Sequence, residues 1–371
     1  MKRIKTAIGS SVLAVAPLLL AAALPAAANR IDRDLGTAIM PGANIVMFYD
    51  MQAAQNTAIG KAMEEMGEKF GDLMEQEQGS NMRELQRKFQ EGTGLQEEDI
   101  RYMLLAVDLD NIDFAAAEPP AIDDLDLVVA IGLDKALSGQ QLVEFIMAMA
   151  EEEGEEPKVR ETSHRGVAVY TFTDIGDALE LEAEELSMAM VADDRVCLVG
   201  PTAALRAAIE RSTDGSRASL SPAMQGIEHS VQSGSQFYIM FTMTEAMKAE
   251  AAEAATKARA GDPSAAAQKA MGTLEGASLS LLMADDAKVA LTGVFGTEED
   301  AGAMTGYLNN MVISSIRMFG GMMLGPRPLP ALQSLRSHQD GGRATLSFTI
   351  TAQDLQTLRE MAEAQPNMQM H

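Results

Sequence analysis

Two histidines occupy similar sequence contexts and are the first candidates for metal binding or proton transfer. The chain has four histidines, and His164 and His338 each follow a serine and precede glycine and a β-type run. Imidazole binds metal ions and titrates near neutral pH. If two halves of the chain pack by pseudo-symmetry, these two rings could approach each other. The alternative interpretation is a solvated turn residue that both halves keep by common ancestry.

The C-terminal tail offers softer ligands. Met368, Met370 and His371 place two thioethers and an imidazole close together in the sequence. Thioether sulfur favours Cu(I), which an exported protein could encounter. Chain termini are usually disordered, so the alternative is a tail without any ligand. These three residues and the two histidines are the metal candidates of the sequence.

Carboxylates cluster between Asp108 and Asp113 and again between residues 123 and 126. Calcium is bound by about six to eight oxygen atoms from a flexible loop. Apolar residues interrupt the EF-hand pattern here, and its glycine is missing. A carboxylate that simply ends a strand is therefore the simpler interpretation of Asp108.

Known catalytic signatures are absent from the sequence. It has no G-x-S-x-G elbow, H-E-x-x-H helix, Walker loop or dinucleotide-binding glycine fingerprint. We therefore assign no catalytic residue, expect no cofactor and favour a function other than catalysis. Catalysis by dispersed carboxylates remains an alternative.

A methionine-rich apolar segment is the candidate surface for a ligand or partner. It surrounds the pair Gly320–Gly321 and ends at Gly325–Pro326. Such a segment predicts a flexible apolar loop after a helix, able to contact an apolar ligand or a partner protein. The alternative is a core helix with a buried loop. The apolar residues of this surface are Met318, Phe319, Met322, Met323 and Leu324.

The elements that must position these residues recur in the same order along the chain. Helices are indicated by apolar residues at steps of three and four, and strands by short β-type runs. The matched segments are 43–51 with 235–243, 100–107 with 277–284, 125–133 with 289–295, 139–152 with 298–318, 167–172 with 343–348, and 202–211 with 352–362. The first half has an additional stretch, 173–199, with its own hairpin. We predict an internal duplication; the alternative is chance similarity of two α+β segments.

The predicted fold class is therefore α+β, with two related halves that each pack a mostly antiparallel sheet against helices. The predicted domains are 29–220 and 221–371, divided where Ser, Asp, Gly and Pro cluster. The layout, together with the opening run ANIVMFYDM, resembles secreted bacterial proteins of uncharacterised function that contain a duplicated α+β unit. That resemblance implies an architecture and a location but transfers no active site.

The N-terminus has the order of features found in secretory signal peptides. Lys2, Arg3 and Lys5 precede an apolar run, and small residues occupy Ala26 and Ala28. We predict a signal peptide over 1–28 and a mature protein in the periplasm or outside the cell. The alternative is an uncleaved anchor. No later segment is apolar and long enough to span a membrane, so we expect no transmembrane segment in the mature chain.

Composition restricts the partners. A formal net charge of −25 makes nucleic acid an improbable partner, and it also disfavours an anionic membrane surface. The acidity fits a salty exterior, a basic partner or divalent cations. The single cysteine, Cys197, excludes an intrachain disulfide and is expected to be buried. Methionine, with 27 residues, is unusually frequent, while tryptophan is absent.

The sequence therefore favours a non-enzymatic binding or assembly protein of the cell envelope. Its expected partner is an envelope protein or an apolar ligand, contacted through protein–protein or apolar surfaces. The first alternative is a carrier of an apolar ligand, such as a lipid, in a methionine-lined cleft. The second is a metal-handling protein.

Overall fold

The computed structural model describes most of the chain; the predicted signal peptide and the C-terminal tail lie outside the described residues. The described residues are 38–63, 82–110, 125–152, 158–173, 185–215, 220–256, 264–323 and 329–364. For residues 82–86, 319–323 and 361–364 only the backbone is described. The candidates Met368, Met370, His371 and Leu324 therefore fall outside the described part.

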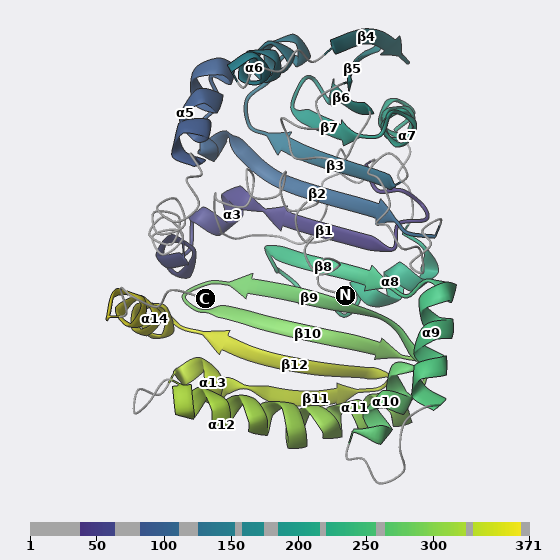
Figure 1. Ribbon diagram of the computed structural model, residues 1–371, viewed down its shortest axis with the longest axis vertical. Coiled ribbons are helices and arrows are strands. Elements are labelled where there is room, and N and C mark those ends of the chain that lie inside the picture. The colour runs from purple at the N-terminus through teal and green to yellow at the C-terminus, as the bar shows by residue number, and fades with distance from the viewer. Residues whose placement is uncertain are drawn as a thin grey trace. The chain divides into compact units, whose positions relative to one another are not determined.

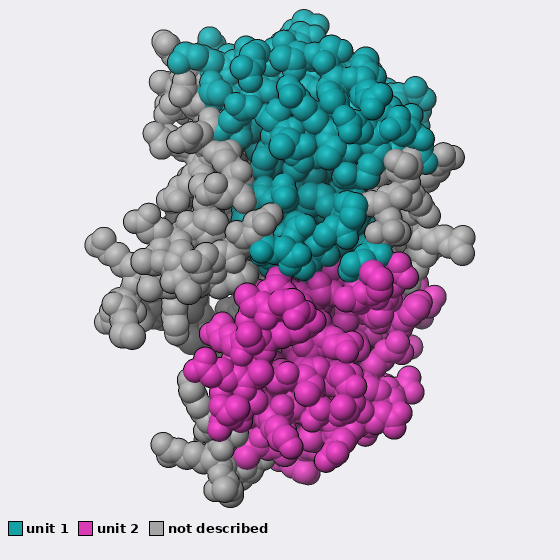
Figure 2. Space-filling model, turned by 90° about the vertical axis from the view of Figure 1, so that its right-hand side faces the viewer, with its two compact units in different colours: residues 1–23, 30–52, 67–221 teal, residues 24–29, 53–66, 222–371 magenta. Residues whose placement is uncertain are grey.

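Internal contacts divide the described chain into two compact units (Figure 2). Unit 1 extends to Gln52 and resumes after the first gap, continuing to Ser221, and unit 2 begins at Pro222. Unit 2 also includes residues 53–63, which the sequence pattern placed in the first copy. They belong with unit 2 because Ile59 packs into a buried cluster with Met283, Ala287 and Leu355.

Unit 1 is an antiparallel sheet with helices. Its strands pair in the order β1-β2-β3-β7-β6-β5-β4 (Figure 1). Its elements are β1 (Ile45–Asp50), α3 (Met51–Gln55, shared with unit 2), α5 (Met82–Thr93), the 3₁₀ turn η1 (Glu97–Asp99), β2 (Ile100–Asp108), β3 (Asp126–Leu133), α6 (Gly139–Glu152), β4 (Lys158–His164), β5 (Val167–Thr173), β6 (Glu185–Val191), β7 (Val196–Gly200) and α7 (Thr202–Thr213).

Unit 2 has the same general construction. Its strands pair in the order β8-β9-β10-β12-β11, again antiparallel. Its elements are α8 (Pro222–Glu228), β8 (Phe237–Thr242), α9 (Glu245–Thr256), α10 (Ala265–Met271), β9 (Leu274–Met283), β10 (Ala287–Phe295), α11 (Glu298–Tyr307), the π-helical segment η3 (Leu308–Ile313), α12 (Ser314–Met323), α13 (Pro330–Ser334), β11 (Arg336–Asp340), β12 (Arg343–Ile350) and α14 (Ala352–Ala364). The predicted α+β class with antiparallel sheets is confirmed.

The first three strands of the two units share one pairing register. The first residue of β1, Ile45, pairs with Val107, and the first residue of β8, Phe237, pairs with Leu281. In both units the register then shifts by one residue where the second strand begins. The unpaired residue of this bulge is Arg101 in unit 1 and Glu275 in unit 2. A bulge bends the strand that contains it, so both meanders bend at the same place.

The next hairpin corrects the sequence alignment. Segment 167–172 was matched with 343–348, but β12 pairs with β10 in the way that β7, not β5, pairs with β3. The backbone hydrogen bonds just before β7 and β12 agree with this pairing. Leu133 N donates to Arg195 O over 2.7 Å, and Phe295 N donates to Gly342 O over 2.8 Å. Hairpin β6–β7 therefore corresponds to β11–β12. Hairpin β4–β5 extends the outer edge of unit 1 and has no counterpart among the described strands of unit 2.

This register also separates the two candidate histidines. His164 ends β4 and pairs with Val167 across a two-residue turn. His338 lies in the middle of β11 and pairs with Thr345, two residues farther from its own turn. The two rings thus occupy different hairpins and different positions within them, because the shared Ser-His dipeptide does not follow the strand register.

One row of side chains across each sheet shows how the two cores differ. In unit 1 the row is apolar and buried, and Leu205 and Ile209 of the neighbouring helix α7 are also buried. In unit 2 the corresponding row is buried but mostly hydroxylated. Following the pairing, the rows are Phe48–Leu104–Ala130–Leu198 in unit 1 and Met240–Ser278–Thr292–Thr345 in unit 2.

Candidate functional site

The candidate site is built on the long helical run that follows β10. This run starts as α6 does in unit 1, with a side-chain cap. Asp300 N donates to Thr297 Oγ1 over 3.1 Å, and Gln141 N donates to Ser138 Oγ over 3.2 Å. Such caps satisfy backbone donors that the first helical turn leaves without partners. Helix α6 has 14 residues, whereas α11, η3 and α12 together continue from Glu298 to Met323. The extension is therefore particular to unit 2.

The extension exposes apolar side chains. Met311, Ile316 and Met318 are 41%, 36% and 57% exposed. Met311, in η3, and Met318, in α12, are seven residues apart and lie on one side of the helical run, whereas Ile316 points to another side. We call Met311 and Met318 the α12 face. In unit 1, by contrast, α6 packs against α5 through the edge-to-face pair Phe89–Phe145, whose ring centroids are 5.4 Å apart. The apolar surface of α6 is thus partly covered by a neighbouring helix.

The predicted surface segment is helical where a loop was expected. Helix α12 continues through the glycine pair to Met323. Met318 is exposed, whereas the side chains of Phe319, Met322 and Met323 are not described and Leu324 lies outside. Glycine costs only about 1 kcal/mol relative to alanine inside a helix, which a run of long apolar neighbours with good helix propensity tolerates.

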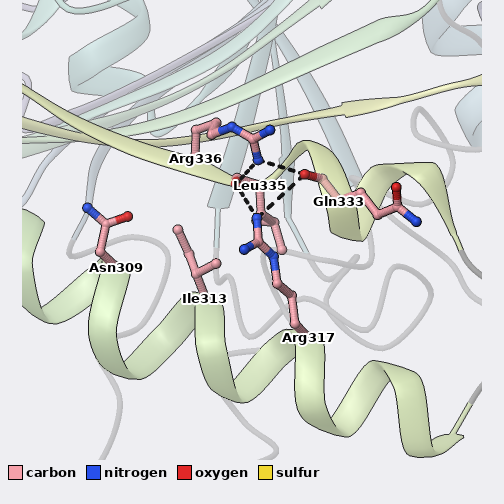
Figure 3. A pocket seen from close by; sticks show the side chains of 6 residues that line it. All are labelled: Asn309, Ile313, Arg317, Gln333, Leu335 and Arg336. Carbon is pink, nitrogen blue, oxygen red and sulfur yellow. Dashed lines mark hydrogen bonds between the residues drawn. The ribbon is translucent and has the colours of Figure 1, made fainter.

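The opposite side of the same helix forms an open groove with α13 and β11 (Figure 3). Asn309, Ile313 and Arg317 are spaced by four residues, so they lie on one side of the helix and point toward Leu335. The groove has a volume of about 580 Å³. Among the described residues, its lining consists of Asn309, Ile313, Arg317, Gln333, Leu335 and Arg336, and no methionine is one of them.

Two guanidinium groups converge in this groove on the same backbone carbonyls. Arg317 donates from Nη2 to Leu335 O over 2.9 Å and to Gln333 O over 3.5 Å, and from Nε to Leu332 O over 3.3 Å. Arg336 donates from Nη1 to Gln333 O and Leu335 O over 2.6 and 2.7 Å. Both groups thereby bind carbonyls at the end of the short helix α13 (Figure 3). Within the described ranges neither guanidinium forms an ion pair with a carboxylate.

The groove belongs to the part of the chain that lacks negative charge. Acidic residues number 54 among 371, yet none occurs between Asp300 and Asp340. The same stretch contains Arg317, Arg327 and Arg336. This stretch therefore carries a net positive charge within a chain whose formal net charge is −25.

The two described metal candidates each have a place within their own unit. His164 Nε2 lies 3.1 Å from Glu210 Oε1 on α7, which makes this histidine part of a strand–helix contact. His338 is exposed on β11. No group of three or more His, Cys, Asp or Glu side chains with metal-binding geometry occurs among the described residues. Cys197 is buried, and burial raises the pKa of its thiol to about 12, so it is protonated at neutral pH.

Comparison with known proteins identifies no relative. None of the family models, curated proteins or solved structures matches this chain. Among the residues that the structure describes, no helix is both long and apolar enough to cross a bilayer. The function must therefore be argued from the chain's own residues.

Proposed function

We propose that this protein is a non-enzymatic binding or assembly protein of the bacterial cell envelope, and that it attaches to its partner through the α12 face. The observation that carries this proposal is the exposure of Met311 and Met318 on a helical extension that α6 lacks. Single exposed apolar residues are ordinary, whereas apolar side chains that share one exposed side can form the kind of patch found at interaction sites. Methionine adapts its shape to different partners. The envelope location rests on the secretory pattern of residues 1–28.

We also infer that the two units arose by duplication of one ancestral unit. The shared strand order, the common pairing register and the bulge at Arg101 and Glu275 support this inference. On this view hairpin β4–β5 was added to one copy and helix α12 to the other. Functional specialisation of one copy would change that copy alone and keep the scaffold that both copies share.

The carrier alternative receives less support from the described residues. A lipid carrier needs a cleft lined by the methionines, whereas the groove is lined by arginines, polar side chains and two buried aliphatic residues. The exposed methionines lie outside that lining. Contact with an external apolar surface uses them more directly.

The test replaces the α12 face and a matched control. Met311→Ser with Met318→Ser is compared with Met271→Ser and Leu358→Ser, whose side chains are 40% and 38% exposed on α10 and α14 of the same unit. Binding of the mature chain to washed envelope membranes is measured by co-sedimentation. The α12 variant should lose most of its binding, and the control should bind like the unsubstituted protein.

Melting curves complete this test. Surface substitutions usually change stability by less than about 0.5 kcal/mol, so both variants should melt within a few degrees of the original protein. A large drop for the α12 variant alone would mean that these methionines are packed in a core. Undiminished binding by a stable α12 variant would locate the contact elsewhere on the molecule.

A further inference from the structure

We propose that the groove between α12 and β11 binds the phosphate of an anionic lipid head group, so that unit 2 docks on an anionic bilayer. The inference goes beyond the proposed function, because the groove lies on the side of the helix opposite to Met311 and Met318. It assigns unit 2 a second contact and names the lipid group that this contact recognises.

The guanidinium groups of Arg317 and Arg336 have N–H donors that the carbonyls do not use. A guanidinium has five N–H donors. Arg317 directs Nη2 and Nε to carbonyls, and Arg336 directs Nη1. Within the described residues, Arg317 Nη1 and the Nη2 and Nε of Arg336 have no acceptor. The carbonyls of Gln333 and Leu335 hold both groups in place, so the remaining donors are held at the groove.

The positive charges of Arg317 and Arg336 also favour an anion. Two guanidinium groups that share acceptors repel each other, and no described carboxylate offsets that repulsion. An anion between them would do so. Guanidinium groups match phosphate oxygens with paired hydrogen bonds, which favours a phosphate over a simple halide. The exposed amide of Asn309 adds a polar group at the groove.

The surroundings indicate an amphiphile instead of a small hydrated ion. The floor of the groove is formed by the buried side chains of Ile313 and Leu335. A volume of about 580 Å³ is larger than one phosphate needs and falls within the usual range of ligand pockets. Ile316 and Met318 flank Arg317 directly in the sequence, so apolar and cationic groups occur within one helical turn. Helices that lie in the membrane interface combine these two features.

The overall acidity of the chain does not oppose this docking at close range. Charges separated by more than about 8–10 Å are largely screened at physiological ionic strength. The stretch between Asp300 and Asp340 contains arginine and no carboxylate. A bilayer facing this stretch therefore meets local positive charge.

The experiment measures co-sedimentation of the mature chain with phosphatidylcholine vesicles that contain or lack phosphatidylglycerol. Binding should require phosphatidylglycerol. Arg317→Gln with Arg336→Gln should weaken it on the order of 30-fold, from about fivefold for each cationic side chain at an anionic surface. A control with equal charge loss is Arg195→Gln with Arg206→Gln, two exposed arginines of unit 1, which should bind normally.

Several results would overturn the inference. Equal weakening by the control pair would mean general electrostatic attraction, and so would normal binding by Arg317→Lys with Arg336→Lys, which keeps the charge and loses the paired geometry. Release from vesicles by inorganic phosphate at the concentration of the lipid phosphate would make the groove a site for soluble phosphate. Arg336→Gln alone should also weaken binding, and it keeps the test decisive if loss of Arg317 impairs folding.

The same assay separates this inference from the proposed function. Equal binding to vesicles with and without phosphatidylglycerol would remove the recognition of an anionic head group but leave apolar docking intact. Normal binding by Met311→Ser with Met318→Ser would remove the α12 face but leave the groove. Each proposal therefore has its own variant and its own failure.

Discussion

The two units place different chemistry on one backbone pattern. The row Phe48–Leu104–Ala130–Leu198 of unit 1 corresponds, strand by strand, to Met240–Ser278–Thr292–Thr345 of unit 2, and both rows are buried. A shared register therefore does not require a shared core. It requires only that each buried group be satisfied, by apolar packing in one unit and by hydrogen bonds in the other.

The hydroxyl groups of unit 2 meet this requirement through specific partners. Ser278 Oγ lies 2.7 Å from Ser230 Oγ, and Thr292 Oγ1 lies 3.0 Å from Thr345 Oγ1. An unpaired buried hydroxyl would cost about 1–3 kcal/mol, and these contacts avoid that cost. Unit 1 instead gains its stability from apolar area removed from water.

The largest expected effect follows from this contrast. Leu104→Ala should lower the free energy of unfolding of unit 1 by about 2–5 kcal/mol, because it leaves a cavity in the buried row. Ser278→Ala, at the corresponding position, should cost about 1 kcal/mol or less, because Ser230 Oγ keeps its bond to Ile227 O. Urea unfolding of both variants measures the difference. Equal losses would mean that the two rows do not differ in how they stabilise the sheet.

An intermediate effect is expected just before the shared bulge. Asp99 O and Thr273 O accept equivalent backbone bonds, from Asp134 N and Gly296 N, but the side chains differ. Burial alone would raise the pKa of the Asp99 carboxyl; the bonds from Lys135 Nζ and Gln96 N outweigh it and lower the pKa below 3.8. A carboxyl whose pKa is lowered in the folded state stabilises the fold at pH values above its ordinary pKa. This contribution is lost as the pH falls through the folded-state pKa.

Asp99→Asn should therefore cost about 1 kcal/mol at neutral pH, and the cost should shrink as the pH falls below 3.8. Unfolding measured at several pH values tests this. Lys135→Gln is the matched partner variant, and the double variant should cost less than the two single changes added together. A pH-independent cost would show that the ion pair with Lys135 does not contribute.

The smallest effect concerns the other end of the second strand. Asp108 faces Asp126 across the sheet, where unit 2 has Leu282 and Lys288. Burial, followed by repulsion from Asp110 and Asp126, raises the pKa of Asp108. The stability linked to a raised pKa is present at pH values below the ordinary pKa of 3.8. It is lost as the pH rises through the folded-state pKa.

Asp108→Asn should accordingly stabilise the protein at neutral pH by up to about 0.5 kcal/mol, with no gain in acid. The retained side-chain oxygen can still accept the bond from Asp110 N. Asp285→Asn, an exposed carboxylate of unit 2, should change nothing. A loss of stability in Asp108→Asn at neutral pH would contradict the repulsion among these carboxylates.

Sequence reasoning located most elements because their periodic patterns are strong. The predicted helix 139–152 coincides with α6, and the β-type runs 43–51 and 235–243 contain β1 and β8. Strand β9 begins at Leu274, before the predicted residue 277, because the bulge at Glu275 interrupts the alternation. The alternation of side chains along a strand separates its two faces but does not show which face is covered. The sequence therefore did not predict that Ser278 is buried and Leu279 is not.

The site was only partly predictable. The sequence indicated the apolar segment around Met318, but a loop was expected where the helix continues. The groove was missed because it brings together Arg317 of one helix and Arg336 of a later strand. Helix and strand periodicity does not relate positions on two different elements. One signal was available in the sequence: acidic residues are absent between Asp300 and Asp340 in an otherwise acidic chain.

The hairpin added to unit 1 also determines how that sheet ends. Strand β4 leaves one row of backbone amides and carbonyls facing outward, and such an edge is where identical chains join into larger aggregates. Lys158, Arg160 and Glu161 are all exposed on this strand. Bringing another strand alongside would strip water from these charges. The outermost described strand therefore disfavours polymerisation of the protein through its own sheet.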